Sequence, residues 1–243
     1  MKEHEDAYGR LLLAFLEGDE QAKEIVERDD RFIQAGLGPS VYFDPFRRWP
    51  AHQRRAMRLV RGRVLDVGAG AGRVALHLQD RGHDVVAIDI SPLAVEVCRR
   101  RGVRDARVRR FEDVDETLGR FDTVVMFGNN FGLFGSSTKA RRLLRRLHRL
   151  TNDGARIVAE SRGVYETKDP EHLAYHERNR RRGRMAGQLR IRIRHRSYAT
   201  PWFDYLIVSR EEMQALVANT GWQVARFLEG EQGVYAAVIE KVA

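Results

Sequence analysis

Residues 64–89 contain the pattern that most restricts how this chain can fold. The apolar run Val64-Leu65-Asp66-Val67 leads into three alternating glycines, Gly68, Gly70 and Gly72, and a second apolar run ends in Asp89. Glycine lets the backbone turn sharply, and it lets a ligand lie against the chain without meeting a β-carbon. An acid about 20 residues after the first glycine is placed by a second strand where it can bind a ribose diol. The pattern therefore predicts a β-α-β unit that binds a nucleotide-type cofactor.

Two kinds of cofactor site use such a glycine turn. Dinucleotide sites take Gly-x-Gly-x-x-Gly or Ala, because the last small residue permits close packing of helix on strand. Here Arg73 stands at that position, which disfavours a nicotinamide cofactor. The spacing Asp-x-Gly-x-Gly-x-Gly from Asp66 to Gly72 closely resembles the first motif of the class I S-adenosylmethionine-dependent methyltransferases. The resemblance implies S-adenosyl-L-methionine as cofactor, with Asp89 on its ribose hydroxyls; a tight turn without a ligand is the alternative interpretation.

The rest of the chain alternates apolar strands with helices, which predicts a parallel sheet with right-handed crossovers. Strands are expected at 63–67, 84–88, 106–111, 121–127 and 155–160, with a final antiparallel pair at 222–228 and 234–241. The resemblance covers about residues 62–163 and 209–243. It implies the Rossmann-like, seven-stranded α/β sheet of that family as the cofactor-binding core.

Two segments lie outside this core. Residues 1–61 are predicted to form an N-terminal helical cap, because 7–28 has the pattern of an amphipathic helix. Residues 164–208 form an Arg-rich insert, in which 189–196 alternates apolar residues with arginine. We expect this insert to be a β-hairpin appended to the sheet, acting as a substrate lid or pairing two chains in a homodimer.

In open α/β sheets the ligand lies outside the carboxyl ends of the strands. Together with the resemblance, this rule gives a set of candidate cofactor-binding residues. Either Glu112 or Asp113 is expected to face the adenine, and the aromatic face of Tyr42 to attract the sulfonium. The candidates are Tyr42, Asp66, Gly68, Ala69, Gly70, Arg73, Asp89, Ile90, Glu112, Asp113, Val114, Gly128 and Asn129.

The residues that contact the acceptor are less defined. The catalytic candidates are Asn129, Asn130, His176 and His195, and further substrate-side candidates are Glu160, Tyr198 and Tyr235. Asparagine beside glycine is also ordinary turn chemistry, and a lone histidine is more often structural. No metal site is predicted, because no metal-ligand spacing is present. Methyl transfer from a sulfonium relies on alignment and desolvation, and a base is needed only when the acceptor must lose its proton.

Composition limits the setting in which the chain works. Its formal net charge is +9 and Cys98 is its single cysteine, so no intramolecular disulfide can form. The polar N-terminus is unlike a secretory signal, and no apolar run approaches ~18 residues, so we expect a cytoplasmic protein without a membrane span. The leading hypothesis is methyl transfer to N or O of a small, anionic metabolite. RNA or protein methylation through the Arg-rich insert, and a catalytically silent binding module, are the alternatives.

Overall fold

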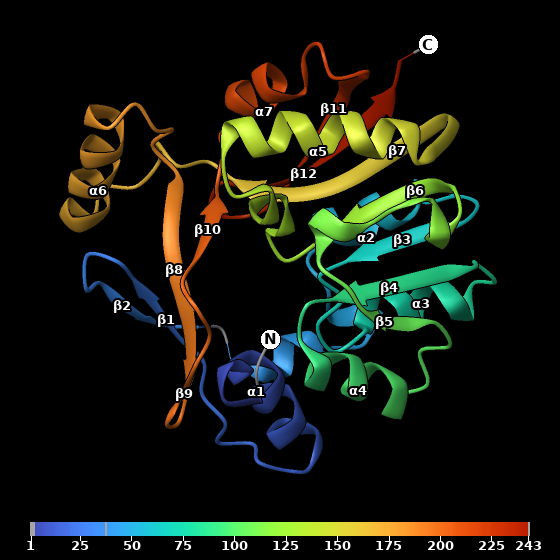
Figure 1. Ribbon diagram of the computed structural model, residues 1–243, viewed down its shortest axis with the longest axis horizontal. Helices are drawn as coiled ribbons and strands as arrows, with labels where there is room; N and C mark the ends of the chain where they lie inside the picture. The colour runs from blue at the N-terminus through green and yellow to red at the C-terminus, as the bar shows by residue number, and fades with distance from the viewer. Residues whose placement is uncertain (1–2, 37, 243) are drawn as a thin grey trace. The chain divides into compact units, whose positions relative to one another are not determined.

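The computed structural model describes residues 3–36 and 38–242, which form an α/β fold (Figure 1). In this part of the chain a seven-stranded sheet has the order β11-β12-β7-β6-β3-β4-β5, which confirms the predicted α/β architecture. A second sheet has the order β10-β8-β1-β2, with β9 paired to β8. The chain divides into two compact units, one of residues 1–49, 63–114 and 191–203, the other of residues 50–62, 115–190 and 204–243.

The first unit contains the parallel β-α-β-α-β segment that the glycine pattern predicted. Strands β3, β4 and β5 pair in parallel, and all residues of β3 and β4 are buried. Pro92 at the first helical position and the Ser91 cap begin the helix after β4, as such residues favour. The elements of this unit are α1 (Ala7–Leu16), β1 (Ile25–Arg28), β2 (Ile33–Ala35), β3 (Val64–Val67), α3 (Arg73–Asp80), β4 (Val85–Asp89), α4 (Pro92–Arg100), β5 (Ala106–Val108) and β9 (Tyr198–Ala199), with 3-10 turns at Pro39–Tyr42, Phe46–Arg48 and Phe111–Asp113.

Helix α1 is fixed against the N-terminus of α4, beside which it lies in Figure 1. Asp6 is 1% exposed and caps α1 by accepting a hydrogen bond from Gly9 N at 3.0 Å. The same carboxylate accepts from Ser91 Oγ at 2.7 Å and from Leu93 N at 3.1 Å. One buried carboxylate therefore satisfies donors at the starts of two helices, which would otherwise lack partners.

The second unit contains strands that run both ways. β6 and β7 pair in parallel, whereas β12 pairs antiparallel with both β7 and β11, which confirms the predicted terminal hairpin. Helices α5 and α7 pack against each other, and α5 also contacts β7 (Figure 1). The elements are α2 (Ala51–Met57), β6 (Phe121–Met126), α5 (Ser137–Arg149), β7 (Thr151–Arg162), α6 (Pro170–Arg181), α7 (Arg210–Val217), β11 (Trp222–Glu229) and β12 (Val234–Lys241), with 3-10 turns at Glu116–Leu118 and Asn130–Phe134; strands β8 (Gln188–His195) and β10 (Phe203–Leu206) have residues in both units.

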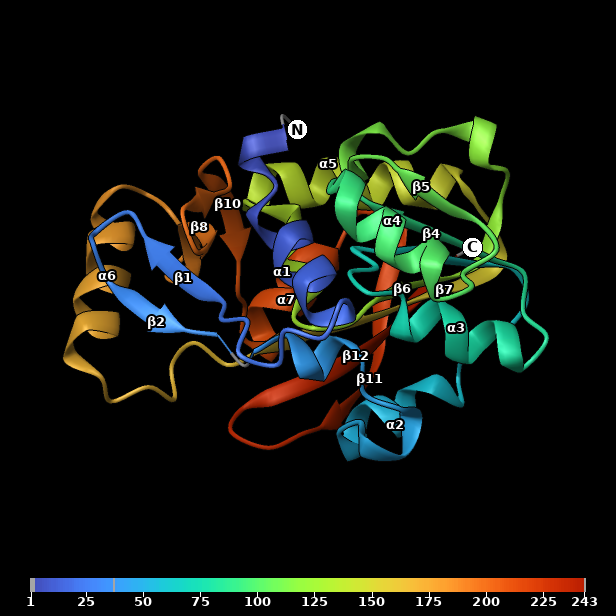
Figure 2. The same ribbon diagram turned by 90° about the horizontal axis from the view of Figure 1, so that it is seen from below.

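Two expectations about the outer segments are wrong. The predicted helix over 7–28 ends at Leu16, close to Gly18 with φ +100°, and β1 follows at 25–28 (Figure 2). The predicted hairpin in the insert does form, but β8 pairs with β1 instead of extending the larger sheet. A charge match across the pair favours this arrangement, because Arg192 and Arg194 of β8 bind Glu27 of β1 at 2.8 and 3.0 Å.

The insert also contains α6, which the sequence analysis did not predict. Asp169 caps it and Pro170 occupies its first position, so the arginine run that begins at Arg178 lies in and just after a helix. No helix in residues 3–36 and 38–242 has the length and apolarity that crossing a membrane requires.

Candidate functional site

The glycine loop after β3 adopts a conformation that side chains disfavour. Gly68, Gly70 and Gly72 have φ values of +71°, +56° and +78°. Asp89, at the end of β4, points at this loop: its Oδ2 accepts a hydrogen bond from Gly70 N at 3.0 Å and its Oδ1 from Ser91 N at 2.9 Å. Burial raises the pKa of Asp89 and these two backbone hydrogen bonds oppose the rise. The sequence pattern thus brings together the predicted residues Gly68, Gly70 and Asp89.

Asp66 is the second buried acid of the loop. It is 2% exposed, and its Oδ2 has no hydrogen-bond partner within the described residues. Burial raises its pKa to about 7, with Arg73 opposing the rise and Asp89 adding to it. A buried acceptor without a donor is costly, so this atom is a suitable partner for a donor or a cation brought by a ligand.

A substitution at Gly72 tests whether the loop requires glycine at this position. A β-carbon there would lie 2.7 Å from Val103 Cγ2 and 3.1 Å from Cys98 Sγ, at a φ of +78°. We expect Gly72→Ala to lower the free energy of unfolding by about 2 kcal/mol, from the unfavourable φ and the clash together. Urea denaturation measures the change. Gly82→Ala, at a similar φ of +85° but with open space around it, is the control and should lose less; equal losses would contradict the role of packing at Gly72.

A pocket of about 340 Å³ lies where β4 and β5 end, lined by Ile90, Val108, Arg109, Arg110 and Asp113. Ile90 and Val108 are 40% and 50% exposed, so two apolar side chains face solvent there. The sequence did not decide which of two acids, Glu112 or Asp113, would face the adenine. In the structure Asp113 lines the pocket, whereas Glu112 lies 3.9 Å from the Arg110 guanidinium. Val114 is buried and does not line it. The pocket therefore combines two apolar residues with two arginines and one acid.

Tyr8 joins the site, although the sequence analysis did not single it out. A β-carbon at Gly70 would lie 2.8 Å from Tyr8 Oη, so the hydroxyl lies directly on the loop. The rings of Tyr8 and Tyr42 meet edge to face at 5.4 Å, and Tyr42 Oη donates to Glu24 Oε2 at 3.0 Å. The predicted residue Tyr42 therefore lies beside Tyr8, which itself touches Gly70.

The other aromatic residues before the loop have packing partners. Phe46 stacks on His77 at 3.9 Å, and the Arg73 guanidinium lies 4.6 Å from the ring centre of Trp49. Phe43 contacts Phe15 at 4.9 Å. Arg73 is thus placed by Trp49 at the start of α3, and these rings attach the segment before Pro50 to the rest of the first unit.

In the second unit, Glu160 lies at the centre of a buried polar network. Its Oε2 accepts from Gln53 Nε2 and lies 3.2 Å from His52 Nε2, while its Oε1 accepts from Asn129 N at 3.2 Å. His52, Gln53 and Glu160 are each less than 5% exposed. Asn129 has a φ of +61°, and its carbonyl accepts from Tyr205 Oη at 2.7 Å. Glu160 and Asn129 were predicted, whereas His52 and Gln53 were not; the network fixes the loop Gly128-Asn129-Asn130 after β6.

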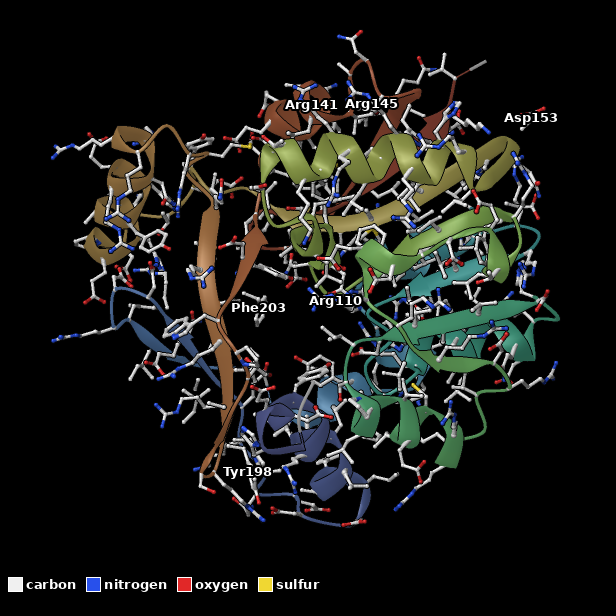
Figure 3. The ribbon with its side chains drawn as sticks, in the orientation of Figure 1. Arg110, Arg141, Arg145, Asp153, Tyr198 and Phe203 are labelled. Atoms are coloured by element: carbon white, nitrogen blue, oxygen red, sulfur yellow. The ribbon has the colours of Figure 1, made fainter. Side chains whose placement is uncertain are left out.

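Three other candidates have structural partners. His195 is 3% exposed and its Nδ1 lies 3.0 Å from the Lys23 carbonyl oxygen. Tyr235 is fully buried and donates to the Val208 carbonyl at 2.8 Å. Arg10 lies over the ring of Tyr198, 4.1 Å from its centre; Figure 3 labels this tyrosine. His176 lies in α6 with 6% of its surface exposed, and Asn130 begins the 3-10 turn that ends at Phe134.

Acidic neighbours neutralise many of the insert's arginines. Glu27 pairs with Arg192 and Arg194, and Asp19 pairs with Arg196 at 2.8 Å. Further pairs join Arg190 to Asp204 and two arginines of α6 to Glu177. An anionic ligand would have to compete with these carboxylates.

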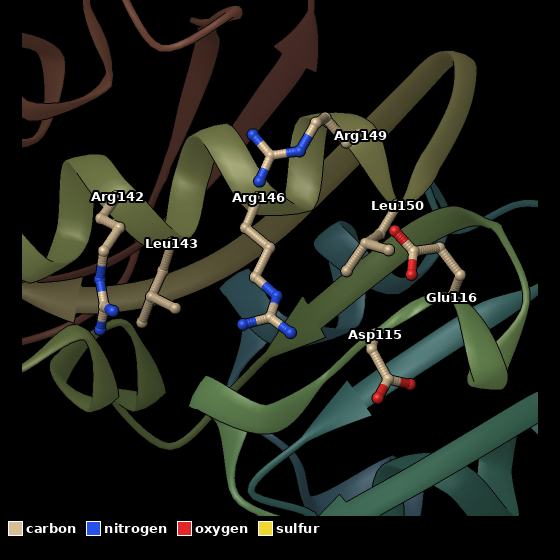
Figure 4. Close-up of a pocket in the computed structure, with 7 residues that line it drawn as sticks. All are labelled: Asp115, Glu116, Arg142, Leu143, Arg146, Arg149 and Leu150. Atoms are coloured by element: carbon tan, nitrogen blue, oxygen red, sulfur yellow. The ribbon is translucent and has the colours of Figure 1, made fainter.

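Another group of basic residues outside the insert is on α5. Arg142, Arg146 and Arg149 line a pocket of about 300 Å³ together with Asp115 and Glu116 (Figure 4). Arg141 and Arg145, labelled in Figure 3, instead donate to backbone carbonyls of Ala215, Ala218 and Asn219. The pocket under α5 therefore carries both signs of charge.

Comparison with known proteins adds independent findings. Residues 64–154 match the family model of a methyltransferase domain. A solved S-adenosylmethionine-dependent methyltransferase from Bacteroides fragilis, in complex with S-adenosyl-L-homocysteine, superimposes with a TM-score of 0.85; it is 27% identical, and the match covers 100% of this chain and 98% of that one. A magnesium-protoporphyrin O-methyltransferase from Rhodobacter capsulatus is 40% identical over 67 residues, and a ubiquinone biosynthesis O-methyltransferase from Xanthomonas oryzae is 40% identical over 72 residues. These two matches cover 26% and 27% of this chain and 30% of each relative.

Proposed function

Because this chain belongs to the class I S-adenosylmethionine-dependent methyltransferase family, we propose that it transfers a methyl group from S-adenosylmethionine to a nitrogen or oxygen atom of a small molecule. The observation that carries the proposal is the arrangement of the glycine loop. Asp89 is bound to the loop through Gly70 N, and Asp66 has an unpartnered buried oxygen. The comparison with the Bacteroides fragilis enzyme, along the whole chain, supports the same conclusion.

The residues of the first unit fit this cofactor. Gly70 has no side chain, so Tyr8 Oη can lie against the loop there, and Asp66 Oδ2 is available to the methionine ammonium. Asp89 is the acid at the end of β4 that would accept hydrogen bonds from the ribose. The pocket of Ile90, Val108 and Asp113 would hold the adenine ring.

When bound, the cofactor supplies a methyl group that is activated by a positively charged sulfur. The work left to the chain is to align the acceptor, hold it at reacting distance and exclude water. Asn129 and Asn130 are the residues we propose for orienting a polar group of the acceptor. We assign no base to Glu160, because Gln53, His52 and Asn129 N already occupy its carboxylate.

A small-molecule acceptor is the better-supported alternative. The names of the Rhodobacter and Xanthomonas relatives specify O-methylation of small molecules, although those matches span a limited part of each chain. Recognition of RNA or of an anionic metabolite through the insert would require its arginines to exchange Glu27, Asp19 and other carboxylates for the ligand. A homodimer formed by strand pairing through the insert would have to use its edge strand β10, because β8 already has a neighbour on both sides.

Calorimetric titration with S-adenosylmethionine between pH 5 and pH 7 tests the proposal. The ionised Asp66 carboxylate would bind the methionine ammonium, and its pKa of about 7 means that protons compete with the cofactor below neutrality. We therefore expect the affinity to fall as pH is lowered from 7, by up to about tenfold per pH unit. Asp66→Asn should bind more weakly at pH 7 and lose most of this dependence. Absence of binding at pH 7 would overturn the function, and an affinity independent of pH would overturn the role of Asp66.

A further inference from the structure

A buried carboxylate beside the glycine loop has no cationic partner. Glu24 is 7% exposed, and its side chain accepts one hydrogen bond, from Tyr42 Oη at 3.0 Å. Within the described residues no lysine, arginine or histidine forms an ion pair with it. Buried acids in proteins are almost always paired, because removing a charge from water without compensation is expensive. Burial accordingly raises the pKa of Glu24, against the opposing effect of the Tyr42 hydrogen bond.

Glu27, on the adjoining strand β1, differs from Glu24 in having cationic partners, so the lack of a cation is particular to Glu24. Glu27 is bound by both Arg192 and Arg194, and these pairs lower its pKa. Glu24 instead lies against the backbone of Gly36, where a β-carbon would come within 2.5 Å of its Oε2. The basic side chains of the neighbouring β8 therefore neutralise Glu27 and leave Glu24 without a cationic partner.

Two aromatic rings accompany the Glu24 carboxylate. Tyr42 holds it by a hydrogen bond, and Tyr8 meets Tyr42 edge to face with an angle of 84° between the rings. Both tyrosines are half-buried. Aromatic rings with a carboxylate nearby form an environment that attracts an alkylated cation more than a neutral group. Tyr8 also touches Gly70, which places this cluster beside the loop proposed to hold the cofactor.

We propose that Glu24, Tyr8 and Tyr42 form a binding site for an alkylated cationic centre of a ligand. The cation has two possible sources with the same chemistry: an amine of the acceptor, which would make the enzyme an N-methyltransferase, or the sulfonium of the cofactor. The inference rests on the proposed methyltransferase function. It adds to it a charge-selective residue, Glu24, that the glycine motif does not contain.

The test compares wild-type protein with Glu24→Gln, which keeps an acceptor for Tyr42 but removes the charge. In the first arm, calorimetry measures the affinities for S-adenosylmethionine and for S-adenosylhomocysteine, whose sulfur is neutral. If the sulfonium occupies the cluster, the preference for S-adenosylmethionine falls by about tenfold in Glu24→Gln. In the second arm, tetramethylammonium is titrated into protein saturated with S-adenosylhomocysteine. If an acceptor amine occupies the cluster, wild type binds this probe and Glu24→Gln binds it about tenfold more weakly.

Glu27→Gln is the matched control, because it also removes a carboxylate from this region but one that arginines already neutralise. It should change neither the cofactor preference nor the binding of tetramethylammonium. Thermal melting separates recognition from a structural role: a carboxylate kept for ligand binding costs stability, so Glu24→Gln should melt at the same temperature as wild type or higher. Unchanged ligand binding in both arms, or a lower melting temperature with equal losses for both cofactor forms, would overturn the site. Wild-type protein that binds neither cofactor form would instead overturn the methyltransferase function.

Discussion

Asp89→Ala is expected to weaken the binding of S-adenosylmethionine on the order of 100-fold. The substitution removes the carboxylate that we propose for the ribose hydroxyls, and hydrogen bonds to a charged acceptor are the stronger ones. It also leaves Gly70 N and Ser91 N without the acceptor that fixes the loop to the start of α4. Calorimetric titration measures the affinity. Urea denaturation should show a free energy of unfolding that is lower by about 2 kcal/mol.

Asp84→Ala provides the control for this experiment. Asp84 stands just before the same strand β4, at its opposite end, and its side chain is 68% exposed in a pair with Arg63 at 2.7 Å. We expect no change in cofactor affinity and a stability change within about 0.5 kcal/mol, because exposed ion pairs contribute little. If Asp89→Ala bound the cofactor as tightly as Asp84→Ala does, the acid at the end of β4 would not be part of the cofactor site.

The geometry of the glycine loop was predictable because its parts are local. Gly68, Gly70, Gly72 and Asp89 lie within one β-α-β segment, so the spacing of residue types along the chain determines which atoms meet in space. The final hairpin was predictable for the same reason. The positions of Glu112 and Asp113 were not predictable, because the two acids are adjacent in the sequence and only the structure shows that Glu112 pairs with Arg110 whereas Asp113 lines the pocket.

Residues that meet across long separations escaped the sequence analysis. His52 and Glu160 are 108 residues apart, and neither belongs to a motif that would connect them. Strand β1 was mistaken for the end of a helix because its four residues are too few to show an alternating pattern. It pairs with β8, in which Arg192, 165 residues away in the sequence from Glu27, binds that acid. Tyr8 and Glu24 joined the candidate site only when the docking of α1 was known.

The network around Glu160 gives the second expected result. Glu160→Ala should lower the free energy of unfolding by about 3 kcal/mol, because His52 and Gln53 would remain buried without their common acceptor. The amide of Asn129 would lose its partner as well. We therefore expect hydrogen exchange at Asn129 to accelerate more than global unfolding explains, as urea denaturation and exchange measured together can show.

Two variants separate the network from a general effect of losing a glutamate. Glu160→Gln keeps a carbonyl oxygen that can accept from Asn129 N, so exchange at Asn129 should remain slower than in Glu160→Ala. Glu240→Ala changes another glutamate of the same sheet, one whose side chain is 39% exposed in a 3.6 Å pair with Arg156, and should alter stability by less than about 0.5 kcal/mol. A loss in Glu160→Ala no larger than that in Glu240→Ala would mean that the loop after β6 is positioned by other contacts, such as the hydrogen bond from Tyr205. A larger loss of stability in Glu160→Ala than in Glu240→Ala would therefore show that the buried carboxylate near the end of β7 positions Asn129.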